Sequence, residues 1–320
     1  MNKKLSLTQD ALKMLNTIIS ITPSILQPLW KERILRQAEK NVFFESREEI
    51  SSDDIFDAAK EVMPSGFSPL FVKLSNPSKF QTIARSGIEG YKETSKRWVK
   101  IKVKRAIQGR KFITRKTKTT PKIIALCGSP RRKGNSDLLI KEFFRGAESR
   151  GAICEEIYLH FKKISYCIGC RKCREKNDGT IIETFCTIKD DMTEIYKKLC
   201  EADAVVIGYP IYTARESAQT AAFWDRLDCM SNKYNKQRFG GRKAGTLITC
   251  WAWPEEHTYR DHMEGMMMLM GLRGIETLFA ISASGCRGRA HGRGVVTQDE
   301  KGMEKVFQAG AKTVEVITEK

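Results

Sequence analysis

Residues Lys122–Leu139 read KIIALCGSPRRKGNSDLL, and this stretch decides the fold. Its first six residues, Lys122–Cys127, form a short apolar run, which is typical of a strand buried on both faces of a sheet. The loop Gly128–Ser136 follows, and DLLIKEFFRGAESRG then predicts a helix. The order strand, loop, helix is that of the first unit in a parallel α/β sheet.

The same alternation continues to the end of the chain. Further apolar runs predict four more strands, at residues 152–159, 203–210, 243–251 and 276–284. Helices are expected at about 190–201, at 217–227 (SAQTAAFWDRL), at about 258–272 and from about 298. Five strands that alternate with helices predict an α/β fold with a doubly wound five-stranded parallel sheet, covered by helices on both faces.

The residues before this sheet differ in character. Helical spacing of apolar residues predicts a small all-α domain over residues 1–75, and a basic connecting segment, 76–120, would join it to the α/β domain of 121–320. Thr22 is expected to cap the second helix, because a proline follows it. Ser51–Asp54 is expected to cap the third, with acidic groups in its first turn.

Most of the excess positive charge lies in one segment. The chain carries 56 Lys and Arg against 38 Asp and Glu, and residues 81–120 hold thirteen of those basic residues with only Glu89 and Glu93 against them. The alternation of charge with apolar residues fits either a helix or a strand. The segment is interpreted as a solvated connection or as a docking surface for an acidic partner, such as nucleic acid, anionic lipid or an acidic electron carrier.

Composition narrows the class of protein. The chain has 320 residues, a mean hydropathy of −0.40 and no apolar run near the ~18–20 residues that a membrane helix needs, so we expect no membrane span. Asp10, Lys13 and Asn16 interrupt what would be the apolar core of a signal peptide, and a cytoplasmic location is expected. Ten cysteines are too few for a disulfide scaffold and indicate metal, iron–sulfur or redox chemistry.

The loop after the first strand has the features of an anion site. It lies where a helix begins, and a helix N-terminus presents unpaired N–H groups and partial positive charge. Ser129, Asn135 and Ser136 can donate hydrogen bonds there, and Arg131 adds a formal charge. A phosphate monoester is the expected ligand; the alternative is an ordinary loop with a serine cap. Asp137 would disfavour a phosphate unless its carboxylate points away from it.

Four cysteines have the spacing of a metal or iron–sulfur centre. Cys167, Cys170 and Cys173 are separated by two residues each, and Cys186 follows after twelve more. Such gaps let three thiolates surround one corner of a centre while a remote fourth closes it. Iron–sulfur, structural zinc, and free thiols or local redox pairs all remain open from the spacing alone.

Taken together, these segments resemble a known family. Lys122–Leu139, the cysteines of CIGCRKC…CTIKDDM, the stretch YPIYTARESAQTAAFWDRL and TCWAW stand in the order found in the NADPH-dependent FMN reductase and iron–sulfur flavoprotein family, a flavodoxin-like group. The resemblance covers residues 121–315. It implies that FMN phosphate lies on four residues of the loop: Ser129, Arg131, Asn135 and Ser136.

The resemblance also implies where the rest of the cofactors lie. The flavin ring is expected against the loop after the third strand and one residue after the fourth: Pro210, Ile211, Tyr212, Thr213, Ala214 and Trp251. An apolar bed with backbone donors, as this loop offers, suits a planar amphipathic ring without reference to any family. A [4Fe–4S] cluster is expected on Cys167, Cys170, Cys173 and Cys186.

The leading hypothesis is therefore an FMN-dependent oxidoreductase. NAD(P)H would reduce the flavin, which would pass electrons to a small-molecule or protein acceptor, through a [4Fe–4S] cluster where one is present. No residue stands out as an acid–base catalyst. The resemblance implies a homo-oligomer, either dimer or tetramer. The alternatives are a flavodoxin-like electron carrier or redox sensor that docks on an acidic partner through residues 81–120, and a redox protein associated with nucleic acid.

Overall fold

The computed structural model describes residues 5–45, 47–88, 99–105, 116–175, 186–230, 242–254, 258–288 and 292–318. The chain divides into two compact units, Met1–Thr82 and Ile83–Lys320, and the division falls within one helix, α5. Each unit has its own hydrophobic core. None of the described helices is both long and apolar enough to cross a bilayer.

The first unit is mainly helical. Its elements are β1 (Ser6–Leu7), α1 (Gln9–Ser20), η1 (Ser24–Leu26), α2 (Gln27–Phe44), β2 (Glu49–Ile50), α3 (Ser52–Val62), η2 (Ser65–Phe67), α4 (Ser68–Ser75) and α5 (Pro77–Ile88), where η marks a 3-10 helix. Its core is formed mainly by α1, α2 and α3, with Leu15, Ile34 and Ile55 fully buried.

The ends of these helices test two capping residues that were predicted from the sequence. Ser51 caps α3 as predicted: its hydroxyl accepts from the N–H of Asp54, whose carboxylate accepts from the N–H of Ser51. The prediction for Thr22 is wrong, because its hydroxyl donates to the carbonyl of Ile19 and ends α1 instead. A short 3-10 turn, η1, then precedes α2, which begins at Gln27.

The second unit contains a six-stranded sheet in the order β3-β8-β7-β6-β4-β5. The strands are β3 (Lys100–Arg105), β4 (Lys122–Cys127), β5 (Ile153–Tyr158), β6 (Ala204–Pro210), β7 (Lys243–Cys250) and β8 (Ile275–Ser284). The five strands from β4 onward are parallel, as predicted. Numbered by themselves they run 2-1-3-4-5, which is the flavodoxin order.

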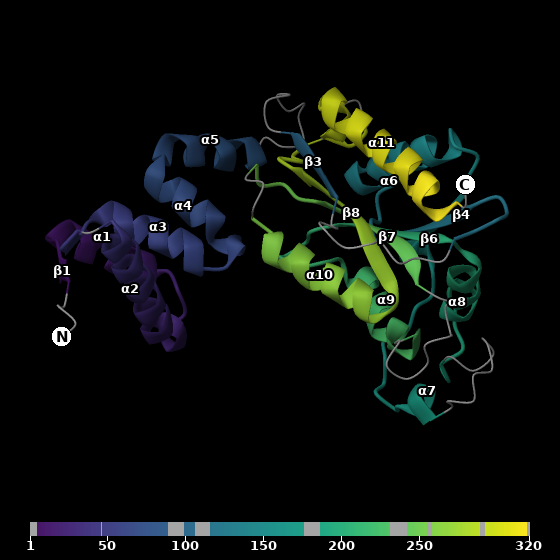
Figure 1. The fold of residues 1–320 in the computed structure, drawn as a ribbon, viewed down its shortest axis with the longest axis horizontal. Helices are drawn as coiled ribbons and strands as arrows, with labels where there is room; N and C mark the ends of the chain where they lie inside the picture. The colour runs from purple at the N-terminus through teal and green to yellow at the C-terminus, as the bar shows by residue number, and fades with distance from the viewer. Residues whose placement is uncertain are drawn as a thin grey trace. The chain divides into compact units, whose positions relative to one another are not determined.

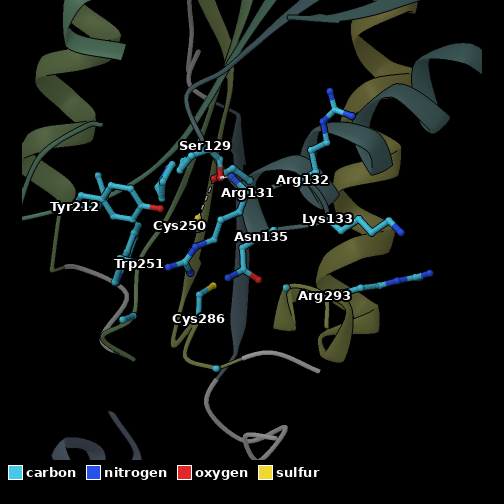
Figure 2. Close-up of a pocket in the computed structure, with 18 of the residues that line it drawn as sticks. Ser129, Arg131, Arg132, Lys133, Asn135, Tyr212, Cys250, Trp251, Cys286 and Arg293 are labelled. Carbon is cyan, nitrogen blue, oxygen red and sulfur yellow. Dashed lines mark hydrogen bonds between the residues drawn. The ribbon is translucent and has the colours of Figure 1, made fainter. Parts of the chain in front are cut away.

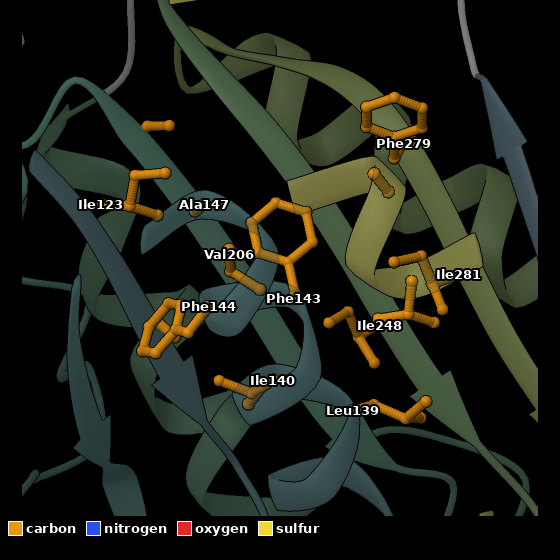
Figure 3. Close-up of a cluster of buried hydrophobic side chains, with 14 of the residues drawn as sticks. Ile123, Leu139, Ile140, Phe143, Phe144, Ala147, Val206, Ile248, Phe279 and Ile281 are labelled. Carbon is orange, nitrogen blue, oxygen red and sulfur yellow. The ribbon is translucent and has the colours of Figure 1, made fainter. Parts of the chain in front are cut away.

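Helices cover both faces of this sheet (Figure 1). They are α6 (Asn135–Glu148), α8 (Met192–Glu201), α9 (Ala218–Arg226), α10 (Arg260–Leu272) and α11 (Glu300–Ile317). A four-residue helix, α7 (Lys172–Glu175), lies away from the sheet, and the short 3-10 segments are η3 (Leu159–Phe161), η4 (Leu227–Met230) and η5 (Val295–Gln298). One core lies under α8, α9 and α10, and the other lies under α6 and α11. Figure 3 shows the second core, where Phe143 and Phe144 of α6 meet Val206 and Ile248 of the central strands.

Two glycines let α6 and α11 cross at close range. A Cβ at Gly146 of α6 would overlap the carbonyl oxygen of Phe307, and one at Gly310 of α11 would overlap the carbonyl oxygen of Phe143. Each helix therefore presents a bare backbone to the other at this crossing. This close contact fixes the position of α6 relative to α11.

The sixth strand, β3, comes from the basic segment. All six of its residues pair antiparallel with Phe279–Ser284 of β8, so the strand alternative fits Lys100–Arg105. Ile101 is buried in the core under α6 and α11, and its N–H donates to Asp299 at the N-terminus of α11. The rest of the strongly basic run, 89–98 and 106–115, lies outside the described residues.

Candidate functional site

A pocket of about 460 Å³ opens at the carboxyl ends of the parallel strands. Its lining comes from the segments after four of these strands: 129–136 after β4, 210–212 after β6, 250–252 after β7, and 286–294 after β8, of which 289–291 are not described. The chain leaves β4 for β5 on one side and reaches β6 on the other, so the pocket lies at the point where the strand order reverses. Ligands of open α/β sheets bind at this point, and the volume is within the range of small-molecule sites.

The loop after β4 presents the start of α6 to this pocket. Gly134 is the N-cap and has no side chain with which to satisfy the first amides of the helix. Lys133 has a φ of 59°, in the left-handed region that non-glycine residues seldom adopt. Ser129 is buried at the base of the loop, and its hydroxyl accepts from the N–H of Arg131. The loop thus combines free helix amides, a hydroxyl and a guanidinium, which are the donors that an anion requires.

Figure 2 shows how the charged side chains of this loop diverge. Arg131 extends into the pocket between Trp251 and Asn135, whereas Arg132 and Lys133 extend away from the two aromatic residues. Arg293 extends to the same side as Lys133. Arg131 is therefore the cation placed to meet an anion inside the pocket, and the other three form its outer rim.

A second loop, after β8, closes against the first. The N–H of Gly294 donates to the carbonyl of Lys133 at 2.8 Å, and the N–H of Val296 donates to Oδ1 of Asn135 at 3.2 Å. A Cβ at Gly294 would overlap Asn135, so only glycine allows this approach. These contacts fix the Asn135 amide and leave its nitrogen for the pocket.

The opposite wall of the pocket is apolar and aromatic. Pro210 and Ile211 follow β6, and Trp251 follows β7 with an exposed fraction of 3%. Tyr212 is more open, at 39%, and its ring stands at the mouth of the pocket (Figure 2). A planar ring system could lie against this wall with a negatively charged group on the loop opposite.

Tyr212 begins a tight turn with unusual backbone angles. Its N–H donates to the carbonyl of Arg215, and its carbonyl accepts the return bond from the Arg215 N–H, which closes a two-residue hairpin. The two central residues, Thr213 and Ala214, have φ values of 50° and 63°, although neither is glycine. Such angles cost roughly 1 kcal/mol or more per residue, and they cluster at ligand sites. Thr213 and Ala214 shape this turn but do not line the pocket.

Two thiols lie in the floor of the pocket. Cys250 Sγ is 3.2 Å from the Ser136 hydroxyl, and burial raises the pKa of Cys250 to about 11. Burial also raises the pKa of Cys286, and the neighbouring Cys250 raises it further. Both thiols are therefore protonated near neutral pH and are poor nucleophiles. They act as packing groups and weak donors.

Asp137 points away from the pocket. Its side chain is fully buried, one oxygen accepts from the Tyr158 hydroxyl at 2.9 Å, and the other accepts from the N–H of Lys133. Lys141, one turn further along α6, forms an ion pair with it at 2.8 Å. The carboxylate is therefore neutralised behind the loop and does not face an anion in front of it.

His262 of α10 supports the loop after β6 through Tyr209 and Glu216. Tyr209 Oη lies 3.1 Å from Nε2 of His262 on α10, and the same imidazole nitrogen is 3.8 Å from Glu216. Burial lowers the pKa of His262, while the Glu216 carboxylate raises it. Tyr209 precedes the Tyr212 turn and Glu216 follows it, so His262 links both ends of the turn to α10.

The segment with the clustered cysteines leaves the sheet after β5. Arg226 of α9 is 2% exposed and donates to both flanks of this segment: to the Ser165 carbonyl at 2.9 Å, and to the Ile188 carbonyl at 3.2 Å. It also forms two hydrogen bonds with Asp190, at 2.7 and 3.1 Å. Burial opposes the charge on Arg226, but Asp190 outweighs it and keeps its pKa raised. Arg226 thus holds the beginning and the end of the cysteine segment together.

The four thiols are not gathered into one group in this structure. Cys167 and Cys170 are exposed, while Cys173 and Cys186 pack partly against the core under α8. Across the described residues, which omit 176–185 between these last two cysteines, no three Cys, His, Asp or Glu side chains form a metal-binding cluster.

Backbone N–H groups donate to two of these sulfurs. The Gly169 N–H donates to Cys167 Sγ at 3.4 Å, and the Lys172 N–H lowers the pKa of Cys170. Gly169 and Arg171 have φ values of 66° and 58°, which turn the backbone around these sulfurs.

The structure brings most of the predicted site residues to one place. Eight of the ten predicted cofactor residues line the pocket, all but Thr213 and Ala214: Ser129, Arg131, Asn135, Ser136, Pro210, Ile211, Tyr212 and Trp251. The sequence reading missed the contribution of residues 286–294 after β8. Their glycine-rich sequence, GCRGRAHGRG over 285–294, directly follows a buried strand, and that signal would have found them.

Known proteins resemble this chain over the same region. The sequence model of the NADPH-dependent FMN reductase family matches residues 121–281. An iron-sulfur flavoprotein of Methanocaldococcus jannaschii is 39% identical over 105 residues, which is 33% of this chain and 51% of that protein. One from Archaeoglobus fulgidus is 25% identical over 201 residues, which is 62% of this chain and 81% of that protein.

The chain thus spans about half the length of the first relative and about four fifths of the second. Among solved structures, an NAD(P)H:quinone oxidoreductase from Methanothermobacter marburgensis aligns with a TM-score of 0.46 and 18% identity, over 61% of this chain and 96% of that one. The strand order 2-1-3-4-5, the pocket at its switch point and a family match over half of the residues agree. The chain belongs to the NADPH-dependent FMN reductase family.

Proposed function

We propose that this protein is an FMN-dependent oxidoreductase that takes electrons from NAD(P)H and passes them to an acceptor. One observation carries the proposal: an anion loop and an aromatic wall face each other across a single pocket at the switch point of the sheet. FMN has a phosphate at one end and a planar ring at the other. When bound, FMN would supply hydride and electron transfer, which no side chain of this pocket can perform.

The residues present fit this cofactor. Arg131, Asn135 and the first amides of α6 would hold the phosphate, because they surround a helix N-terminus that has no side-chain cap of its own. Ser129 and Ser136 lie at the base of the loop, where their hydroxyls would add donors. Gly294 leaves the space in which Asn135 is held.

The opposite wall would orient the ring. Ile211 and Trp251 give an apolar surface, and Tyr212 at the mouth would limit access of water to one edge of it. The strained turn at Thr213 and Ala214 would hold the Tyr212 ring at this edge of the pocket. The proposal assigns no acid–base catalyst to this chain.

We extend the proposal to a [4Fe–4S] cluster on Cys167, Cys170, Cys173 and Cys186. The observation in its favour is that Arg226 holds both flanks of the segment while backbone N–H groups donate to its first two thiols. Among the described residues the four sulfurs are not gathered into one group, so binding of a cluster would have to draw them together. Iron and sulfide analysis of protein purified without oxygen, beside a Cys170→Ser variant, would distinguish a cluster from zinc or free thiols.

The alternative function is that of an electron carrier or redox sensor. The basic strand β3 and the basic residues that flank it in the sequence would then dock on an acidic protein. Association of the chain as a dimer or tetramer belongs to the leading proposal. Steady consumption of NAD(P)H in the presence of free FMN or a quinone would favour the enzyme. Binding to an acidic protein that weakens steeply with salt, without turnover, would favour the carrier.

The test of the proposal is the difference in affinity between FMN and riboflavin, which lacks the phosphate. We expect the protein to bind FMN more tightly by isothermal titration calorimetry. Arg131→Ala should weaken FMN binding by about tenfold to a hundredfold, the usual value of a hydrogen bond to a charged group, and leave riboflavin almost unchanged. Arg150→Ala, beyond the far end of α6, is the control and should bind FMN like the wild type.

Two outcomes would contradict the proposal. One is a protein, isolated without oxygen, that is colourless and does not bind added FMN. The other is equal loss of FMN and riboflavin affinity in Arg131→Ala, since that would mean that Arg131 supports the fold and not the phosphate.

A further inference from the structure

A cluster of buried acidic and phenolic groups lies directly behind the anion loop. Asp137 on α6 is its centre, and it is fully buried. It accepts a backbone N–H from Lys133, the one residue of the loop with a left-handed φ, and the Tyr158 hydroxyl at the end of β5. The left-handed conformation is unfavourable for lysine, so the carboxylate compensates for a cost within the loop.

Tyr158 makes a second contact with the same loop. The Arg132 guanidinium lies 5.5 Å from the centre of the Tyr158 ring and 5.0 Å from that of Phe161. These are cation–π distances. The face of the Tyr158 ring therefore holds Arg132. The Tyr158 hydroxyl holds Asp137, which in turn holds the backbone of Lys133. Two consecutive residues of the loop depend on one side chain of β5.

Glu156 lies two residues before Tyr158 on the same face of β5. Its Oε1 is buried and has no hydrogen-bond partner among the described residues. Burial and the charge of Asp137 together raise the pKa of Glu156 to about 7, against the opposing effects of Tyr158 and Lys141. Glu156 also contacts the Cys127 thiol of β4. Burial raises the pKa of this thiol well above neutrality. Within this cluster, Glu156 is thus the group that changes charge near pH 7.

We propose that Asp137 and Tyr158 are positioning residues for the phosphate loop, and that the half-buried Glu156 beside them makes the grip of the loop on phosphate depend on pH. The inference rests on the proposed function, since it concerns the phosphate end of the same pocket. It assigns roles to three residues that do not line the pocket.

The direction of the pH dependence follows from charge. Below neutral pH, Glu156 is protonated and adds no negative charge behind the loop. Above it, Glu156 ionises, and a second negative charge in a poorly solvated site opposes the phosphate in front. A bound phosphate would in turn favour the protonated form of Glu156, because the two effects are linked. Affinity for FMN should therefore fall as the pH rises through about 7.

The experiment measures FMN and riboflavin affinity between pH 6.5 and 8.5. The second ionisation of a phosphate monoester lies near pH 6, so most of it is complete in this window. We expect the wild type to lose threefold to tenfold in FMN affinity across the window, since a shift of one pH unit in a linked group corresponds to tenfold. Glu156→Gln mimics the protonated acid and should bind FMN with a flat profile.

Glu155→Gln is the matched control. Glu155 directly precedes Glu156 in β5, faces the opposite side of the strand and pairs with Lys198. Its replacement by Gln removes the same charge. It should keep the slope of the wild type. Tyr158→Phe removes the hydroxyl but keeps the ring under Arg132, and it should lower FMN affinity by about fivefold to tenfold without changing riboflavin affinity.

The outcomes separate the two proposals. A wild type that prefers FMN over riboflavin, together with a Glu156→Gln profile as steep as that of the wild type, would overturn the inference and leave the proposed function intact. An equal loss of FMN and riboflavin binding in Tyr158→Phe would also overturn it. A wild type with no preference for FMN would remove the proposed function and the inference together.

Discussion

Arg226 and Asp190 form a buried ion pair in the second unit. The Arg226 side chain is wholly buried, that of Asp190 is 3% exposed, and the pair is completed by the carbonyls of Ser165 and Ile188. Taking two charges out of water costs several kcal/mol per ion, so an arrangement of this kind persists only when its hydrogen bonds are satisfied. Removal of one partner would leave the other charged and unpaired in the protein interior.

We predict that Arg226→Ala lowers the free energy of unfolding by about 3–5 kcal/mol, the usual cost of breaking a buried pair. Urea denaturation would measure this effect. Arg145→Ala, which breaks an exposed pair with Glu142, is the control and should change stability by less than about 1 kcal/mol. A similar small loss in Arg226→Ala would show that the pair contributes little.

The same pair gives a pH dependence. Arg226 lowers the pKa of Asp190, although burial opposes that shift. The pair therefore contributes to stability above the ordinary carboxyl pKa near 4, and the contribution is lost as the pH falls through the lower folded value.

At the scale of single residues, the sequence predicted the hydrogen-bond donors of the anion loop better than the side chains behind it that hold the loop in place. Ser129, Arg131 and Asn135 could be found because a loop between a buried strand and a helix has a known relation to anions. Tyr158 and Glu156 could not, because alternate residues of an edge strand point to opposite faces and no local pattern shows which face meets α6. The prediction for Thr22 was wrong because a threonine hydroxyl can donate to a carbonyl at the end of one helix as well as accept from an amide at the start of the next, and here it donates to Ile19.

At the scale of helices, the crossing of α6 and α11 depends on two glycines. We predict that Gly146→Ala and Gly310→Ala each lower the free energy of unfolding by about 1–3 kcal/mol or more, because the new methyl meets a rigid backbone carbonyl. Thermal or urea unfolding of the full chain would measure it.

Gly265→Ala on α10 is the matched control for these changes. Nothing lies within 4 Å of a Cβ at Gly265, so only helix propensity changes, and stability should rise by about 0.5–1 kcal/mol. If all three variants had the same stability, the close approach of α6 and α11 would be wrong.

The parallel strands were the most predictable elements. The run KIIALC coincides with β4, and the other four differ from their predicted bounds by one residue at either end or not at all. β4, β6 and β7 are almost fully buried, and strands buried on both faces are continuous apolar runs whose short length distinguishes them from helices. β3 was left open between helix and strand because alternating lysines suit an exposed edge as well as a solvated helix face. Its partner, β8, is 170 residues or more away in sequence, and sequence patterns do not report such pairings.

At the scale of the molecule, the two units have separate cores. The candidate pocket lies entirely within the second. FMN should therefore stabilise only that unit. At a free FMN concentration a hundred times the dissociation constant, the gain would be about 2.7 kcal/mol.

We predict two transitions in calorimetry of the full chain, of which FMN raises only one. Riboflavin at the same concentration is the control and should raise it less. An equal rise in both transitions, or a single transition under all conditions, would mean that the two units unfold together.

The position of β3 also determines where the chain can be shortened. Its six residues shield the edge of β8, an apolar strand, and Asp299 engages the amide of Ile101. A polypeptide that began at Pro121, where the family match begins, would keep the whole parallel sheet and every described residue of the pocket. It would also expose an unpaired hydrophobic edge to other molecules, and such edges seed aggregation. Solubility on expression would therefore depend on a strand that contributes nothing to cofactor binding.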